Sequence, residues 1–230
     1  MNYLESIEEN GFVIIPDFMD RAELENLVSS IHKLPLNEND RYAARDLLRK
    51  VPQIKDFLKE NKAGALLKPL LGPNFFAVRG LFFNKVPGAN WKVTWHQDVT
   101  IAVKKKVETP GFGPWSVKAG IVHTQAPNSL LAKMLAVRIH LDECNEVNGP
   151  LRVIPGSHRS GRLKQNEIEE HTLKMESVPC LVPEGGILLM KPLVLHASSP
   201  ALRPENRRVI HIEFAVGDLP GGLEWFEKVL

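Results

Sequence analysis

The sequence predicts a mainly β domain with a helical N-terminal part, in which helices pack on the outside of one sheet of a two-sheet jelly roll. Residues 1–72 carry apolar side chains at helical spacing. From residue 73 to 230 the chain consists of short runs rich in Val, Ile and Phe, bounded by Gly and Pro, which is typical of a sandwich or barrel. A chain of 230 residues can build one large core, so we expect a single domain over 1–230.

Helical periodicity in the N-terminal part is clearest over 21–33, where Asp20 stands in an N-cap position. The apolar face of this segment consists of Leu24, Leu27, Val28 and Ile31. The same spacing predicts further helices over 41–50, 54–61 and 63–70. Pro52, Gly64 and Gly72 punctuate these segments.

Six short runs are expected to form the strands of the core. They are FFAVRGLFFNKV, WKVTWHQDVTIAV, MLAVRIHLD, PLRVIP, GGILLMKPLVLH and RRVIHIEFAV. Between the second and third runs, residues 104–129 form a long stretch rich in Gly and Pro. Because so long a loop in a compact domain is more often a lid than a simple connector, we expect a lid loop there.

The stretch TWHQDV places His96 and Asp98 one residue apart within a predicted strand. Alternate side chains of a strand point to the same face, with backbones about 6.6 Å apart, so the imidazole and the carboxylate could meet on one small ion. The alternative is a polar pair on the solvent face of the strand, since a two-residue pattern carries little information alone.

A divalent metal site built on His96 and Asp98 needs a further donor, and His196 is the downstream candidate. It follows an apolar run at a point where a strand would leave the core, a rim position that often presents side chains to ligands. Two imidazoles and one carboxylate on one side of an ion form the facial triad of non-haem iron(II) oxygenases. The alternative is a core histidine that hydrogen-bonds to the backbone.

Eleven residues after His196, Arg207 opens the last predicted strand. A planar guanidinium can grip a carboxylate with two parallel hydrogen bonds, and Ser198 could add a donor, so the pair suits a dicarboxylate cosubstrate. A solvated strand end is the alternative. Arg208 belongs to the apolar face of this strand and Arg207 to the polar face, so the apolar face alone would place Arg208 toward the core. Arg207 can still point into the cavity between the sheets if the apolar face, with Arg208, packs on the N-terminal helices.

Composition limits the partners. Lys and Arg number 29 against 27 Asp and Glu, a formal net charge of +2, which offers no strong attraction for nucleic acid or an anionic membrane. Cys144 and Cys180 have neither a disulfide framework nor zinc-type spacing, which fits a reducing compartment. No secretory signal and no apolar run near the ~18 residues of a membrane span is present. We expect a cytoplasmic monomer or homodimer that acts on a small molecule.

The motifs WHQD, NGPLRVIPGSHRSG, HASSP and RR, in this order, resemble the phytanoyl-CoA dioxygenase family of iron(II)/2-oxoglutarate oxygenases. The resemblance runs from Gly11 to about Phe214 and implies a cupin-like double-stranded β-helix. It implies that His96, Asp98 and His196 hold Fe(II), and that Arg207, assisted by Ser198, binds the far carboxylate of 2-oxoglutarate. The implied reaction uses O₂, converts 2-oxoglutarate to succinate and CO₂, and hydroxylates a C–H bond of a small organic molecule.

One position departs from the family pattern. Many relatives carry an aromatic residue where LAVRIHLD places Arg138, on the same predicted face as His140 and Asp142. Arg138 could bind an anionic substrate or touch the cosubstrate. Alternatively it could form an internal ion pair with Asp142 or Glu213.

Two rival functions use a similar metal site. A halogenase of this family leaves a vacant place for chloride where the carboxylate normally binds, and Asp98 fills that place. A non-oxidative cupin-like metal-binding protein, either a sensor or an isomerase that uses the ion as a Lewis acid, remains the main alternative. Arg207 and Ser198 discriminate against it, because such a protein needs no dicarboxylate anchor.

Overall fold

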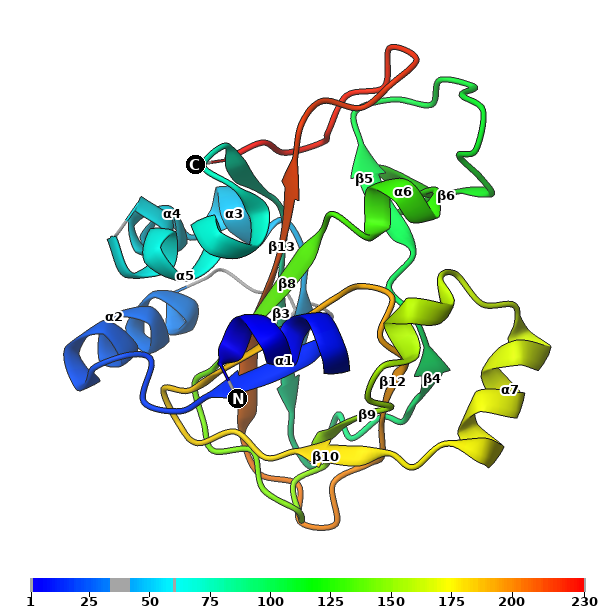
Figure 1. Cartoon of the computed structure of the whole chain (residues 1–230). Coiled ribbons are helices and arrows are strands. Elements are labelled where there is room, and N and C mark those ends of the chain that lie inside the picture. Colours follow the sequence, from blue (N-terminus) through cyan, green and yellow to red (C-terminus); the bar gives the residue numbers. More distant parts are fainter. Residues whose placement is uncertain (1, 34–41, 60, 230) are drawn as a thin grey trace.

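Three antiparallel sheets and an outer layer of helices make up the computed structural model, which describes residues 2–33, 42–59 and 61–229 (Figure 1). The largest sheet has six strands in the order β1-β11-β8-β13-β3-β2. Their bounds are β1 Phe12–Ile15, β2 Ala43–Ala44, β3 Phe75–Lys85, β8 Leu135–His140, β11 Ile187–Met190 and β13 Arg207–Val216. The long β3 and β13 pair over their whole length and form the centre of this sheet.

A second sheet of four strands lies in the order β10-β9-β12-β4. Its strands are β4 Val93–His96, β9 Leu151–Val153, β10 Val178–Cys180 and β12 His196–Ser198. Residues of both sheets, among them Val153, Cys180, Leu188 and Met190, share one buried apolar cluster. The two sheets therefore pack as a jelly roll, and the predicted fold class is confirmed.

The third sheet, β5-β7-β6, corrects the expectation of a loop over 104–129. It contains β5 Thr100–Val103, β6 Trp115–Lys118 and β7 Ile121–Gln125, followed by the short helix α6 Asn128–Leu131. Lys118 pairs with Ile121 across a two-residue turn, in which Ala119 and Gly120 both have positive φ. A two-residue turn of this kind matches the twist of antiparallel strands, so this short hairpin forms within a Gly- and Pro-rich segment.

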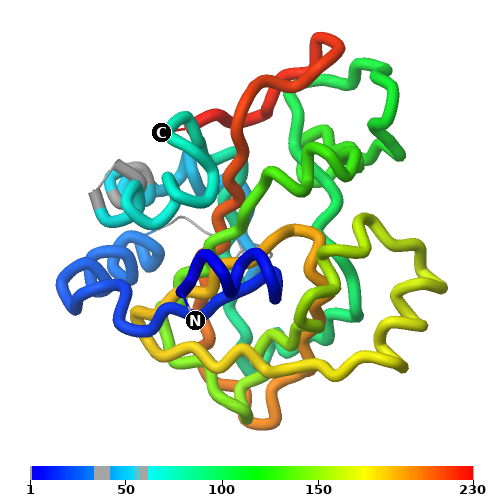
Figure 2. The backbone as a smooth tube through the Cα atoms, in the orientation of Figure 1, coloured from blue at the N-terminus to red at the C-terminus, as the bar shows by residue number. Residues whose placement is uncertain are grey.

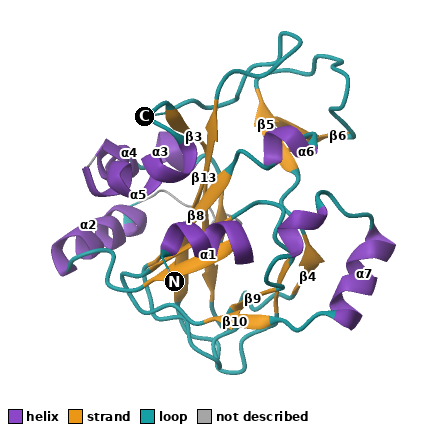
Figure 3. Cartoon of the chain, viewed as in Figure 1, coloured by secondary structure: helices purple, strands orange, loops and turns teal. Residues whose placement is uncertain are grey.

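The N-terminal helices cover the outer face of the six-stranded sheet (Figure 3). They are α1 Tyr3–Asn10, α2 Arg21–His32, α3 Leu47–Lys50, α4 Pro52–Lys59 and α5 Asn61–Leu71. Asp20 caps α2 as predicted, in a reciprocal capping box with Glu23. Leu27, Leu48 and Leu67 join Ile210 and Ile212 of β13 in the main buried cluster, so β13 turns one face to the helices. None of the helices in the described ranges has the length and apolar character needed to cross a bilayer.

One helix prediction was wrong, and one helix was missed. Most of the expected helix over 41–50 is absent from its described residues, because Ala43 and Ala44 pair with the edge of β3 and Asp46 has a φ of 62°, which interrupts a helix. Arg41 lies outside the described residues. The helix α7 Gln165–Lys174 was not predicted, because only Ile168 in it is buried.

The chain after β13 turns back across the molecule toward the N-terminal helices (Figure 2). Trp225 bridges to Val103 of β5, and Val229 bridges to Ala77 of β3. This segment therefore ties the third sheet to the six-stranded sheet.

Candidate metal centre

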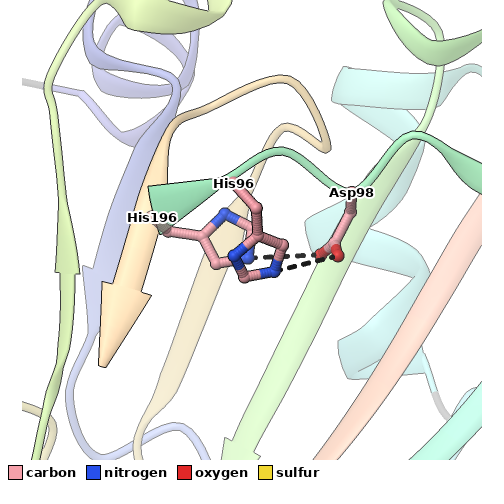
Figure 4. A group of neighbouring side chains, drawn as sticks. All are labelled: His96, Asp98 and His196. Carbon is pink, nitrogen blue, oxygen red and sulfur yellow. Dashed lines mark ion pairs between the residues drawn. The ribbon is translucent and has the colours of Figure 1, made fainter. Parts of the chain in front are cut away.

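His96, Asp98 and His196 lie together, and their possible ligand atoms are all within 4.8 Å of one another (Figure 4). His96 ends β4 and His196 opens β12, and the two residues are in Cα register across this antiparallel pair. Asp98 is not on the strand, as the sequence argument assumed, but on the turn after β4. Its backbone N–H donates to the carbonyl of Pro192 at 2.9 Å, which fixes the turn.

Both imidazoles present Nε2 to the carboxylate. His96 Nδ1 lies 2.8 Å from the carbonyl oxygen of Thr94, and His196 Nδ1 lies 2.9 Å from that of Val194. Since a carbonyl only accepts, Nδ1 carries the proton in each ring and the lone pair is on Nε2. The two Nε2 atoms lie 3.8 and 3.5 Å from the oxygens of Asp98. Each histidine is therefore held in the tautomer and orientation of a metal ligand.

The electrostatic surroundings of Asp98 and His196 favour the protonation states in which these groups bind a metal. Burial opposes ionisation of Asp98, but the nearby imidazoles of His196, His211 and His96 and the guanidinium of Arg79 together hold its pKa well below the usual range. Burial lowers the pKa of His196 to about 4, against the opposing attraction of Asp98. At neutral pH the site therefore offers a carboxylate and a neutral imidazole, the forms that bind a divalent ion.

A cavity of about 250 Å³ adjoins the triad and is also lined by the predicted anchor residues Arg207, Ser198 and Arg138. Arg207 is 4% exposed, and its Nη1 donates to the carbonyl of Gly149, while its Nε has no hydrogen-bond partner among the described residues. Ser198 donates to the same carbonyl at 3.2 Å. A buried guanidinium with an unpaired N–H suits an anion in the cavity.

Arg207 and Arg208 point to opposite faces of β13, and Arg207 is the one that faces the cavity. Arg208 points to the outer face, where it binds Asp142 through Nη2 at 2.6 Å and Nε at 2.9 Å. Arg207, His211 and Glu213 line the cavity. Alternation along β13 thus separates an outer ion pair from an inner polar surface.

Arg138 pairs with neither of the carboxylates proposed for it. Asp142 is bound by Arg208, and Glu213 is bound by Arg79 at 3.0 Å. Arg138 lines the cavity and donates to His211 Nδ1 at 3.1 Å, and its Nε has no hydrogen-bond partner in the part of the chain that the structure describes. Burial, followed by the charge of Arg207, lowers its pKa to about 10.

Sequence reasoning missed Lys85, which is 1% exposed and lies on the cavity wall. Its Nζ donates to Ser198 Oγ at 2.7 Å and to the carbonyl of Ser199 at 2.5 Å. Burial, followed by the charge of Arg207, lowers its pKa to about 8. Alternation along FFNK was the available signal, because Lys85 shares a face with the inward-pointing Phe83 and Leu81.

The phytanoyl-CoA dioxygenase (PhyH) family profile matches residues 7–209 of the chain. Among curated proteins, the chain is 24% identical over 250 residues to the peroxisomal phytanoyl-CoA dioxygenase of Mus musculus. That alignment covers 92% of this chain and 67% of the mouse protein.

Solved structures of the same fold include SnoK, a non-haem α-ketoglutarate-dependent carbocyclase from nogalamycin biosynthesis. It has a TM-score of 0.72 at 14% identity and covers 94% of this chain and 83% of its own. EctD from S. alaskensis, crystallised with 2-oxoglutarate and 5-hydroxyectoine, has a TM-score of 0.71 at 16% identity and covers 93% and 74%. HygX from Streptomyces hygroscopicus, with iron bound, has a TM-score of 0.67 at 14% identity and covers 93% and 85%.

The two kinds of comparison agree with the architecture. The structural likeness shows a shared jelly-roll fold, and the family profile extends over most of the two packed sheets and the helices outside them. The family predicted from the ordered motifs is thereby confirmed: the chain belongs to the phytanoyl-CoA dioxygenase family.

Proposed function

We propose that this protein is a non-haem Fe(II)/2-oxoglutarate-dependent dioxygenase that hydroxylates a C–H bond of a small organic molecule. The observation that carries the proposal is the position of the His96, Asp98 and His196 cluster on the same cavity as the buried Arg207. A metal alone would explain the cluster. An arginine with an unpaired N–H at the other part of the cavity calls for a second, anionic ligand.

The triad fits Fe(II). Two neutral imidazole nitrogens and one carboxylate oxygen are the donor set of the facial triad, which leaves further coordination positions for other ligands. The cluster comes from one strand pair and the adjoining turn, so the three donors reach the ion from one side. His96, Asp98 and His196 would hold the ion.

The opposite part of the cavity fits a dicarboxylate. Arg207 would bind the far carboxylate of 2-oxoglutarate, with Ser198 as a further donor and Lys85 adding positive charge. These groups are buried, which strengthens their attraction for an anion relative to groups in water. Iron and 2-oxoglutarate, when bound, supply the O₂-dependent oxidation in which 2-oxoglutarate becomes succinate and CO₂.

The contribution of the chain is to bind, orient and shield. The carbonyls of Thr94 and Val194 fix the two imidazoles, and Gly149 fixes the guanidinium of Arg207. Burial of Ser198 and Arg207 limits water around the bound cosubstrate. SnoK, which shares the fold, is a carbocyclase, so hydroxylation is the outcome that we propose and not one that the fold dictates. We also propose that the protein acts in the cytoplasm, because Cys144 and Cys180 are free, buried thiols.

The proposal is tested by 2-oxoglutarate binding and by product analysis. We expect saturable binding of 2-oxoglutarate to the Fe(II)-loaded protein without O₂, and succinate formation when O₂ is admitted. Arg207→Ala should weaken binding by about 10²-fold or more, because the far carboxylate loses a buried charged partner. Mass spectrometry with ¹⁸O₂ during a screen of small molecules then checks for a hydroxylated product.

Arg208→Ala is the matched control, since it removes the neighbouring arginine from the outer face. It should leave 2-oxoglutarate binding unchanged even if it lowers stability. Metal binding without any 2-oxoglutarate binding would favour the non-oxidative metal protein and overturn the proposal. Equal effects of the two substitutions would remove Arg207 from its role.

A further inference from the structure

The register of the six-stranded sheet orders the polar side chains along the cavity. Arg207, at the start of β13, lies opposite Lys85. His211 comes four residues later, and Glu213 follows it opposite Arg79. All five side chains line the cavity. The cavity wall therefore runs from a purely cationic end, at Arg207, to a mixed end at Glu213.

The metal ligands lie beside the mixed end. Arg79 Nη1 donates to the carbonyl of Thr100 at 3.4 Å, two residues after Asp98, and Arg79 and Asp98 line the same cavity. Cosubstrate bound between Arg207 and the metal would therefore occupy the first part of this wall. The part around Arg79 is left for the primary substrate.

Arg45 is a further cation at this end. It directly follows β2, whose Ala43 pairs with Phe83 of β3, and it lines the cavity together with Arg79. Arg45 is partly buried and makes no hydrogen bond or ion pair within the part of the chain that the structure describes. Burial and then the charge of Arg79 lower the pKa of Arg45, against the opposing attraction of Glu213.

The carboxylates that line this end of the cavity are already engaged. Glu213 binds Arg79 at 3.0 Å, and Asp98 is one of the candidate metal ligands. Arg45 therefore has no carboxylate partner among the described residues that line this cavity.

We propose that the primary substrate is a small carboxylic acid and that Arg45 binds its carboxylate. This inference rests on the proposed function, because it assigns Arg207 to the cosubstrate. Bound iron would take Asp98 and bound 2-oxoglutarate would take Arg207, so both cofactors leave Arg45 without a carboxylate partner in the cavity. The carboxylate of the substrate supplies that partner.

A carboxylate fits this region better than a phosphate. A guanidinium presents parallel N–H donors that match the planar carboxylate. Phosphate sites in proteins typically add backbone N–H groups from glycine-rich turns or helix N-termini. No glycine is among the described residues that line the cavity.

Calorimetric binding to the Ni(II)-loaded protein, saturated with 2-oxoglutarate, tests the inference without turnover. The probes are a panel of short aliphatic, aromatic and amino acids, each compared with its primary amide. We expect acids to bind, and the matching amides to bind at least about tenfold more weakly. Arg45→Gln should weaken binding of the acids by about 10- to 100-fold, and Arg45→Lys by less, since lysine keeps the charge and loses the fork.

Two controls separate this inference from the function on which it rests. Arg49→Gln removes a largely exposed arginine from the adjoining helix α3 and should leave acid binding unchanged. The affinity of Arg45→Gln for 2-oxoglutarate should equal that of the wild type. If the wild-type protein did not bind 2-oxoglutarate, the proposed function would be contradicted instead. With that binding intact, the inference is overturned if amides bind as well as acids, if Arg45→Gln has no effect, or if no acid in the panel binds.

Discussion

His96 and His196 face each other across the β4–β12 strand pair, in Cα register and with ring centroids 4.2 Å apart. Strand pairing itself therefore delivers two of the three candidate ligands. Asp98 reaches the same point because the turn after β4 is fixed to Pro192, four residues before His196. Since the three groups are assembled only in the folded chain, metal binding and folding are coupled at this site.

Metal binding should stabilise the fold. A ligand that binds only the native state adds about 2.7 kcal/mol at 100 times its dissociation constant. For a domain of this size each kcal/mol raises Tm by about 2–4 °C, so Fe(II) or Ni(II) should raise Tm by about 5–10 °C. Thermal unfolding with and without metal, without O₂, measures this shift, and a chelator should reverse it.

The variant His196→Ala should lose the metal-dependent rise in Tm, because it removes a buried ligand of the cluster. His171→Ala, on the peripheral helix α7, should keep the full rise. A rise of the same size in both variants would place the metal elsewhere.

Gly149→Ala should weaken both the fold and cosubstrate binding. Gly149 has a φ of 72°, and a Cβ there would lie 2.7 Å from the carbonyl oxygen of Ser199. Strain of this kind costs about 1–3 kcal/mol, and its relief would move the carbonyl that holds Arg207 and Ser198. Denaturant unfolding and titration with 2-oxoglutarate measure the two effects.

Gly72→Ala provides the matched control, because Gly72 has a φ of 83° but an added Cβ would meet nothing within 4 Å. It should cost about 1 kcal/mol of stability and leave 2-oxoglutarate affinity unchanged. If Gly149→Ala also left that affinity unchanged, the carbonyl would have no part in positioning the guanidinium.

Lys85 should make 2-oxoglutarate binding depend on pH. Its pKa is lowered to about 8 by burial and by Arg207, so it is charged at pH 7 and largely neutral at pH 9. The charged form attracts the dianion, so affinity should be nearly full at pH 7 and fall several-fold as the pH rises through the pKa of about 8 to pH 9. Titration of the Ni(II)-loaded protein at several pH values measures the change.

Lys85→Met should show weaker binding at pH 7 and a flat profile between pH 7 and 9. The exposed neighbour Lys92 offers the comparison, since Lys92→Met should retain the profile of the wild type. A profile that persisted in Lys85→Met would assign the titration to another group.

The sequence predicted the cluster of candidate metal ligands, but it did not predict the partners of the buried arginines. Spacing and motif order brought His96, Asp98 and His196 together correctly, although Asp98 lies on a turn and not on the strand. The three side chains still meet, because a side chain can extend to the same point from slightly different backbone positions. The partners of Arg138 were not predictable, because they depend on which carboxylates Arg79 and Arg208 take first.

The fold, too, was predicted in part. Alternation along RRVIHIEFAV predicted the strand β13 and the members of its two faces, but the choice of Arg207 over Arg208 for the cavity came from the family resemblance. The β6–β7 hairpin was missed because its turn, Ala119-Gly120, lies within a segment whose composition is typical of a loop. Lys85 was missed because a lysine at the end of a strand is usually solvated, and its burial depends on the neighbouring sheet.

The ion pair of Arg79 and Glu213 should be strongly coupled. Their atoms lie 3.0 Å apart, with side chains only 14% and 6% exposed, and His211 Nε2 lies 3.4 Å from the same carboxylate oxygen. Glu213→Gln leaves Arg79 buried and uncompensated beside Arg45, which should cost about 3–5 kcal/mol of unfolding free energy. Arg79→Met should cost less, because His211 Nε2 still lies 3.4 Å from the Glu213 carboxylate.

A double-mutant cycle measured by urea unfolding isolates the coupling. The variant with both Arg79→Met and Glu213→Gln should be more stable than the sum of the single losses predicts, by about 1–3 kcal/mol. The exposed pair of Lys104 and Glu224 gives the comparison cycle, in which the coupling should be below about 1 kcal/mol. Additive losses at Arg79 and Glu213 would mean that solvent screens the pair as it does on the surface, and that the charge beside the metal ligands is not fixed by this contact.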